Sequence, residues 1–105
     1  MSVAVIWSDG AVDDLTRLRK FIEPHNQDAA YLAAQTILSA TETISGHPQI
    51  GTSVENMIDD GDYRDLLIPF GKYGYVLRYR YLDNAVYILH IKHGKEKEFR
   101  ELPQA

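Results

Sequence analysis

Hydrophobic positions recur at helical spacing along the first half of the chain and predict two helices. Ser8 or Asp9 can cap the first helix and Pro24 ends it, while Gly46 followed by Pro48 is typical of the end of the second. The link between them is short, so we expect an antiparallel helical hairpin. The apolar face of the first helix holds Ala11, Leu15, Leu18 and Ile22, with Val12 beside it. That of the second holds Ala30, Ala33, Ala34, Ile37, Leu38, Thr41 and Ile44.

Short runs rich in β-branched and aromatic residues predict four strands. We expect these strands over residues 3–7, 63–70, 75–81 and 86–93. Residues 45–62 lack a sustained period and predict a loop, with a turn of helix at 53–57. The predicted fold is therefore α+β, in the order β-α-α-β-β-β, with the helical hairpin packed on a small, mostly antiparallel sheet.

The last two predicted strands form a hairpin around Asp83 and Asn84, and its register decides which residues share a face. A three-residue loop centred on Asn84 sets the arginines of the first strand beside His90 and Lys92. A two-residue loop sets them beside Tyr87, Leu89 and Ile91 instead. We favour the first register, because it gathers apolar residues on the face that the helices cover. In the first strand of this hairpin, alternation predicts one face with Tyr75, Leu77, Tyr79 and Tyr81 and the opposite face with Val76, Arg78 and Arg80. In the second strand, it predicts one face with Tyr87, Leu89, Ile91 and His93 and the opposite face with Val86, Ile88, His90 and Lys92.

The length of 105 residues and the 45 % hydrophobic content fit one domain, residues 1–105. The chain has no cysteine, and the apolar run at residues 3–7 is too short for a signal segment or a membrane span, so we expect a cytoplasmic protein. The net charge is −4, with three basic against nine acidic residues in 1–60 and eight against six in 61–105. This balance disfavours stand-alone nucleic-acid binding but leaves a mildly basic half for an acidic partner.

The residues that could carry chemistry form no recognised catalytic or cofactor-binding motif. His90 and His93 lie three apart on a predicted strand and so face opposite sides, which excludes their chelating one metal ion together. The acidic run at 59–62 lacks the spacing of a calcium loop, and the glycines at 71 and 74 open no phosphate-binding helix. Any chemistry would have to rest on the remaining polar residues, which could equally form a solvated face of an antiparallel sheet: Arg64, Arg78, Arg80, His90, Lys92, Lys95 and Lys97.

Four motifs in order give the chain a family resemblance. They are "HPQIG" after the second helix, "YRDLLI" on the next strand, then "GYVLRYRY" and "VYILHIKHGKE" in the hairpin. Together they resemble the RelE/ParE superfamily of bacterial type II toxins, most of all its ParE-like, plasmid-stabilisation branch. The resemblance implies a toxin held inactive by a cognate antitoxin that wraps it, and a complex that contacts operator DNA through the antitoxin.

The resemblance also suggests a target. RelE-like members are similar to ribosome-dependent ribonucleases of mRNA, and their motif has an arginine where this chain has Val76. ParE-like members bind DNA gyrase without hydrolytic chemistry or a cofactor. We therefore expect a gyrase inhibitor with no catalytic residues and no metal. A ribonuclease, or a degenerate toxin that only binds its antitoxin, is the alternative. The expected target-binding residues are Arg64, Arg78, Arg80, His93, Lys95 and Lys97.

Overall fold

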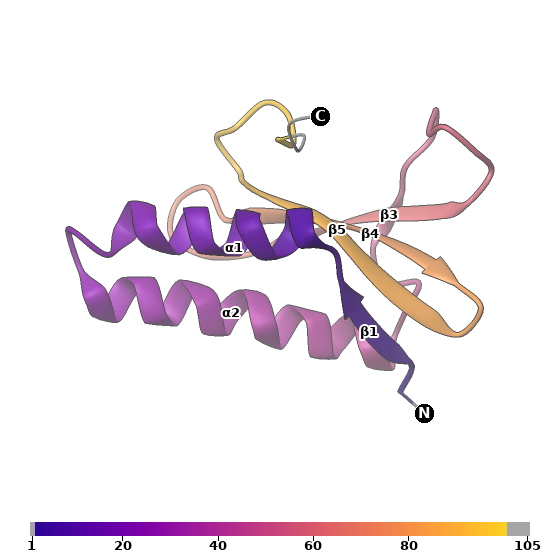
Figure 1. The fold of residues 1–105 in the computed structure, drawn as a ribbon, viewed down its shortest axis with the longest axis horizontal. Helices are drawn as coiled ribbons and strands as arrows, with labels where there is room; N and C mark the ends of the chain where they lie inside the picture. The colour runs from indigo at the N-terminus through magenta and orange to yellow at the C-terminus, as the bar shows by residue number, and fades with distance from the viewer. Residues whose placement is uncertain (1, 101–105) are drawn as a thin grey trace.

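The computed structural model describes residues 2–100, in which two helices pack against a five-stranded mixed sheet (Figure 1). Strand β1 runs parallel to β5, and the other neighbours in the order β1-β5-β4-β3-β2 are antiparallel. The α+β prediction is confirmed, with one additional strand, β2. The elements are β1 (Ala4–Trp7), α1 (Asp9–Ile22), α2 (Gln27–Gly46), β2 (Thr52–Ser53), β3 (Asp62–Ile68), β4 (Tyr75–Leu82) and β5 (Ala85–His93).

Both helices begin at capping residues that satisfy a free backbone N–H group. The Ser8 hydroxyl accepts a hydrogen bond from Ala11 N at 3.1 Å, and the Asn26 side chain accepts one from Ala29 N at 3.0 Å. Of the two predicted caps for α1, Ser8 is therefore the one used. No helix in residues 2–100 is both long enough and apolar enough to cross a membrane.

The core lies between the helical hairpin and the inner face of the sheet, which is the face that the helices cover. Its largest fully buried side chains are Tyr79, Ile37, Ile44, Leu77, Ile88, Ile91 and Val86. Burying each large apolar side chain contributes about 1.5–3 kcal/mol to folding. Leu38, which was predicted on the apolar face of the second helix, is instead 38 % exposed, and Val12, predicted beside the face of the first, is 48 % exposed.

The hairpin between β4 and β5 turns on two residues, so the favoured three-residue loop is wrong. Asp83 and Asn84 both have positive φ, 49° and 61°, as a two-residue turn with the twist of its strands requires. Near the turn, Arg80 therefore pairs with Tyr87. A bulge then shifts the register, and beyond it Arg78 pairs with His90 and Val76 with Lys92, as the favoured register had placed them.

The bulge also corrects the predicted faces of the last strand. Val86 and Ile88 are fully buried before it, and Ile91 is fully buried after it. Strict alternation along the strand would have placed Val86 and Ile88 on one face of the sheet and Tyr87, Leu89 and Ile91 on the other. The extra residue in the strand resets the alternation, so all three buried residues reach the core.

The segment between α2 and β3 contains β2 in place of the expected turn of helix. Thr52 pairs with Asp65 and Ser53 with Arg64, so this short strand forms the edge of the sheet. No helical residue occurs at 53–57. The strand predicted over 63–70 ends at Ile68, just before Pro69, which cannot donate to a sheet ladder.

Candidate functional site: the outer face of the sheet

The outer face of the sheet, opposite the helices, presents Arg78 in a paired state. Arg78 Nε and Nη2 donate to the two carboxylate oxygens of Asp65 at 2.8 and 3.0 Å, across the β3–β4 pair. Both side chains are about a quarter exposed, 25 % and 26 %. This two-point contact fixes the plane of the guanidinium group. Arg78 is therefore a rigid, partly neutralised cation at the centre of the face.

Arg80 lies two residues further along the same face and is also engaged. Its Nη1 lies 3.7 Å from Asp59 Oδ2, and its guanidinium carbon lies 5.1 Å from the centre of the Tyr63 ring. Asp59 in turn accepts hydrogen bonds from Gly61 N at 2.8 Å and from the Tyr63 hydroxyl at 3.2 Å. The acidic run at 59–62 thus lies beside Arg80, with Asp59 bonded to Gly61 and Tyr63.

Arg64 points to the opposite face from Arg78 and Arg80. It pairs in register with Tyr79, whose side chain is fully buried on the inner face. Its Nη1 donates to Gln49 O at 2.9 Å and Gly51 O at 2.8 Å, and its Nε donates to Asp62 at 2.9 Å. These bonds anchor the loop after α2, so Arg64 stands apart from the two outer-face arginines.

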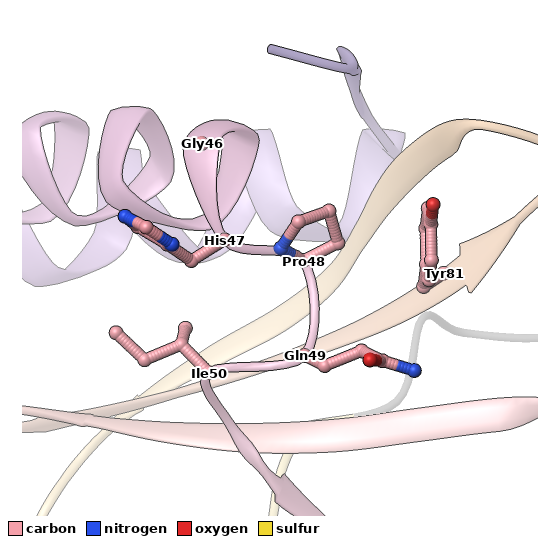
Figure 2. A pocket seen from close by; sticks show the side chains of 6 residues that line it. All are labelled: Gly46, His47, Pro48, Gln49, Ile50 and Tyr81. Carbon is pink, nitrogen blue, oxygen red and sulfur yellow. The ribbon is translucent and has the colours of Figure 1, made fainter. Parts of the chain in front are cut away.

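The "HPQIG" loop, residues 47–51, connects α2 to β2 and surrounds a shallow hollow of about 630 Å³ (Figure 2). The Tyr79 hydroxyl anchors the loop from below, accepting from Gly51 N at 3.0 Å and donating to Pro48 O at 2.7 Å. Burial raises the pKa of Tyr79 above 10.0, so the hydroxyl keeps its proton for this bond. Figure 2 shows Pro48 and Gln49 on the side of Tyr81, with His47 and Ile50 pointing the other way. The "HPQIG" loop therefore has a structural role, because the Tyr79 hydroxyl holds its backbone in place.

The bulge in β5 is held by α1. Ser8 Oγ donates to Leu89 O at 2.9 Å, and the carboxylate of Asp14 accepts from Ile91 N at 2.9 Å. The same carboxylate oxygen lies 3.2 Å from His90 Nδ1. Asp14 is only 4 % exposed and also faces Arg17 Nη2 at 3.5 Å. The first helix therefore fixes both the bulge and the imidazole of His90, beside Arg78.

His93 and Lys95 lie at the far end of β5, away from the Arg80 end of the sheet. His93 pairs with Tyr75, and their rings meet edge to face with centroids 5.8 Å apart. Lys95 Nζ lies 5.7 Å from the centre of the Tyr73 ring. His90 faces the outer side and His93 the side of buried Tyr75, as predicted, and no group of three or more potential metal ligands occurs in residues 2–100.

Glu96 fastens the segment that follows β5, residues 94–100, which we call the strap. Its carboxylate accepts from Arg17 Nη1 at 3.1 Å and from His93 N at 3.0 Å, and its carbonyl accepts from Lys92 Nζ at 2.7 Å. Burial raises the pKa of Glu96, but these hydrogen bonds and the charges of Arg17 and Arg100 outweigh burial and lower the pKa below 4.5. The ionised carboxylate therefore stabilises the docked strap.

Replacing Glu96 with glutamine is expected to lower the free energy of unfolding by about 1 kcal/mol near neutral pH. A lowered pKa stabilises the fold above the unfolded value of 4.5, and this stabilisation is lost as the pH falls through the folded value. Urea unfolding at about pH 7 and about pH 3 should therefore show the difference only at the higher pH. Glu98→Gln, at an exposed position of the same strap, is the control. An equal loss at both pH values would contradict this account.

Lys97 belongs to a second hollow, of about 830 Å³, on the outer face of the sheet beneath the strap. Its lining holds four cationic side chains, Arg78, Lys92, Lys97 and Arg100, against the carboxylates of Asp65 and Glu98. The six residues expected to bind a target therefore lie in different parts of the structure. Arg78 and Lys97 line this hollow, and Arg80 lies along the same face. Arg64 anchors a loop, His93 ends β5 and Lys95 lies in the strap just after it.

This architecture, a helical hairpin packed on a five-stranded mixed sheet, defines a small α+β domain. The family model for the ParE toxin of the type II toxin-antitoxin system parDE matches residues 5–98. The chain therefore belongs to the ParE toxin family, within the RelE/ParE superfamily, and a type II toxin implies a cognate antitoxin as partner.

Curated relatives and a solved structure agree with this membership. The chain is 38 % identical over 85 residues to Toxin RelE3 of Caulobacter vibrioides, covering 80 % of this chain and 86 % of that protein. It is 31 % identical over 97 residues to Toxin RelE1 of the same organism, covering 92 % and 99 %. A structure of the chromosomal ParDE TA system from P. aeruginosa shares the fold, with a TM-score of 0.69 at 17 % identity over 88 % of this chain and 96 % of that one.

Proposed function

We propose that this toxin, as a single domain of residues 1–105, inhibits DNA gyrase by binding it as a protein and is neutralised by its cognate antitoxin. The observation that carries the proposal is the pairing of the outer-face arginines. Arg78 and Arg80 are the residues that could replace the arginine missing at Val76, and each faces a carboxylate. A ribonuclease needs cations free to neutralise a phosphate, whereas paired charges suit protein recognition, where they set orientation and specificity.

The alternative is a RelE-like ribonuclease acting on ribosome-bound mRNA. Two observations favour it: the curated relatives bear RelE names, and His90 is held by the Asp14 carboxylate beside Arg78. A histidine that a carboxylate orients in this way has the geometry of a general acid or base. Either target would place the toxin in the cytoplasm. A toxin that only binds its antitoxin would show neither activity.

The deciding experiment is a supercoiling assay with purified gyrase, titrated with the toxin after its release from the antitoxin. We expect loss of supercoiling together with cleaved, protein-linked DNA, and reversal on adding the antitoxin. Cleavage of ribosome-bound mRNA with no effect on gyrase would instead establish the ribonuclease. An absence of both activities in folded toxin would identify the degenerate form.

A further inference from the structure

The strap turns back after β5 and places Phe99 between cationic side chains of the outer face. In Figure 1 this segment curls over the sheet on the side away from α2. The Phe99 ring centre lies 4.5 Å from the guanidinium carbon of Arg78 and 5.5 Å from Lys92 Nζ, and its centroid lies 6.3 Å from that of the His90 ring. We call Arg78, His90 and Lys92 the Phe99 cage. Such cation–π contacts are directional and favour an aromatic ring over an aliphatic side chain.

All three members of the cage have partners other than Phe99, and Lys92 Nζ donates to Glu96 O. Asp65 holds Arg78 through two hydrogen bonds, and Asp14 holds His90 from the first helix. The cage is therefore expected to keep its shape when the phenyl ring leaves. A preformed site of this kind binds a ligand without first ordering its own side chains.

The outer part of the strap is weakly fastened. Beyond Glu96, no backbone hydrogen bond joins residues 97–100 to the rest of the described chain, and the Arg100–Glu96 ion pair is long, at 3.6 Å, with Arg100 63 % exposed. Lys97 and Glu98 are exposed, whereas Phe99 is partly buried. The Phe99 contact is thus the main attachment of this part, and such a segment can be displaced by a competing ligand.

From these contacts we infer that the Phe99 cage is a recognition site for an aromatic side chain of a partner protein, and that Phe99 occupies it as an internal competitor. The surrounding hollow has an apolar floor of Leu67, Val76 and Leu89 and an excess of cations on its lining. The fitting partner segment therefore presents one aromatic ring flanked by carboxylates. The inference rests on the proposed function, because a protein target would reach the toxin through this face.

The test measures binding of a synthetic pentapeptide, a phenylalanine between two pairs of glutamates, by calorimetry. We expect the Phe99→Ala variant to bind this peptide about 5- to 10-fold more tightly than the native chain, because the competitor is gone. Phe99→Leu, which keeps an apolar side chain without the aromatic ring, should show most of this gain. The same peptide with alanine in place of phenylalanine is the control ligand and should not distinguish the variants.

A second substitution shows whether the cage itself binds the peptide. Adding Lys92→Gln to Phe99→Ala should remove the gain. Because Lys92 Nζ also donates to Glu96 O, thermal unfolding of the double variant is measured to show that it is folded at the temperature of the binding experiment. Equal peptide binding by native and Phe99→Ala toxin would overturn the inference. Tighter binding of a short single-stranded RNA than of the peptide to Phe99→Ala would also overturn it, and would assign the cage to a nucleobase beside phosphates.

The gyrase assay separates this inference from the proposed function. If gyrase uses the cage, Phe99→Ala toxin should inhibit at several-fold lower concentration than the native chain. If neither form inhibits gyrase, the proposed target is wrong, while the peptide result still decides whether the cage recognises an aromatic acidic segment. Weaker inhibition by a folded Phe99→Ala toxin would make Phe99 a contact residue and overturn its role as competitor.

Discussion

Gyrase inhibition is expected to fall at least about 100-fold when Arg78 and Arg80 are both replaced by glutamate, because reversing a docking charge costs about 1.4 kcal/mol or more and each such step is tenfold. Both arginines lie on the outer face, two residues apart on β4, where a partner meets them together. The measurement is a supercoiling titration with purified toxin, supported by growth arrest in cells that lack the antitoxin.

The pairing of these arginines determines the controls. Glutamate at 78 lies opposite Asp65 and glutamate at 80 lies near Asp59, so the double variant should also lose about 1–2 kcal/mol of stability. Swapping Asp65 and Arg78 as Asp65→Arg with Arg78→Asp restores the pair and should recover that part of the loss. Arg19→Glu, a charge reversal on the exposed surface of α1, should leave inhibition unchanged. A folded double variant that inhibits like the native chain would exclude this face as the docking site.

The helices and the order of strands could be predicted from the sequence because their signals are local. The Ser8 cap, the stop before Pro24 and the apolar stripes of α1 and α2 each depend on neighbouring residues. The short strand β2 could not be predicted in this way. Its two residues, Thr52 and Ser53, carry no alternation of their own and are ordered by pairing with β3.

The bulge in β5 could not be predicted from the alternation of residues along the strand, because it depends on contacts with the α1 region. Nothing in "VYILHIKHG" marks Leu89 as the extra residue, since both alternating sets of positions in the run contain apolar residues. The bulge persists because Ser8 and Asp14 of the α1 region bond the backbone around it. The predicted neighbours of Arg78 were right for this reason, although the predicted turn was wrong.

The candidate site could be predicted only in part, because side-chain partners come from distant segments. A period of two correctly placed Arg78 and Arg80 together, but grouping Arg64 with them overlooked that it pairs with inward-facing Tyr79. The roles of Asp65, Asp14 and Phe99 were missed. A carboxylate at Asp65, in a predicted strand rich in apolar residues, was the one local signal that an arginine on the neighbouring strand had a partner.

Removing the Asp14 carboxylate is expected to have the largest effect on stability. Asp14→Ala should lower the free energy of unfolding by about 3 kcal/mol, because it leaves the buried Ile91 N–H without its acceptor and Arg17 Nη2 without the carboxylate 3.5 Å away. Asp14→Asn keeps an acceptor for Ile91 N, so its loss should be about half as large. Urea unfolding measures both, and Asp13→Ala, at the exposed neighbouring position, is the matched control with a change of at most about 0.5 kcal/mol.

The same substitution connects the fold to the candidate site. Without Asp14, the bulge loses one of its two side-chain anchors and His90 loses the carboxylate that orients it. One of the three side chains of the Phe99 cage is then no longer held in position. Asp14→Ala toxin with the Phe99→Ala change should therefore bind the acidic phenylalanine peptide several-fold more weakly than Phe99→Ala alone, at a temperature where both are folded. Equal binding would mean that Asp14 supports the fold alone and that Arg78 and Lys92 suffice for recognition.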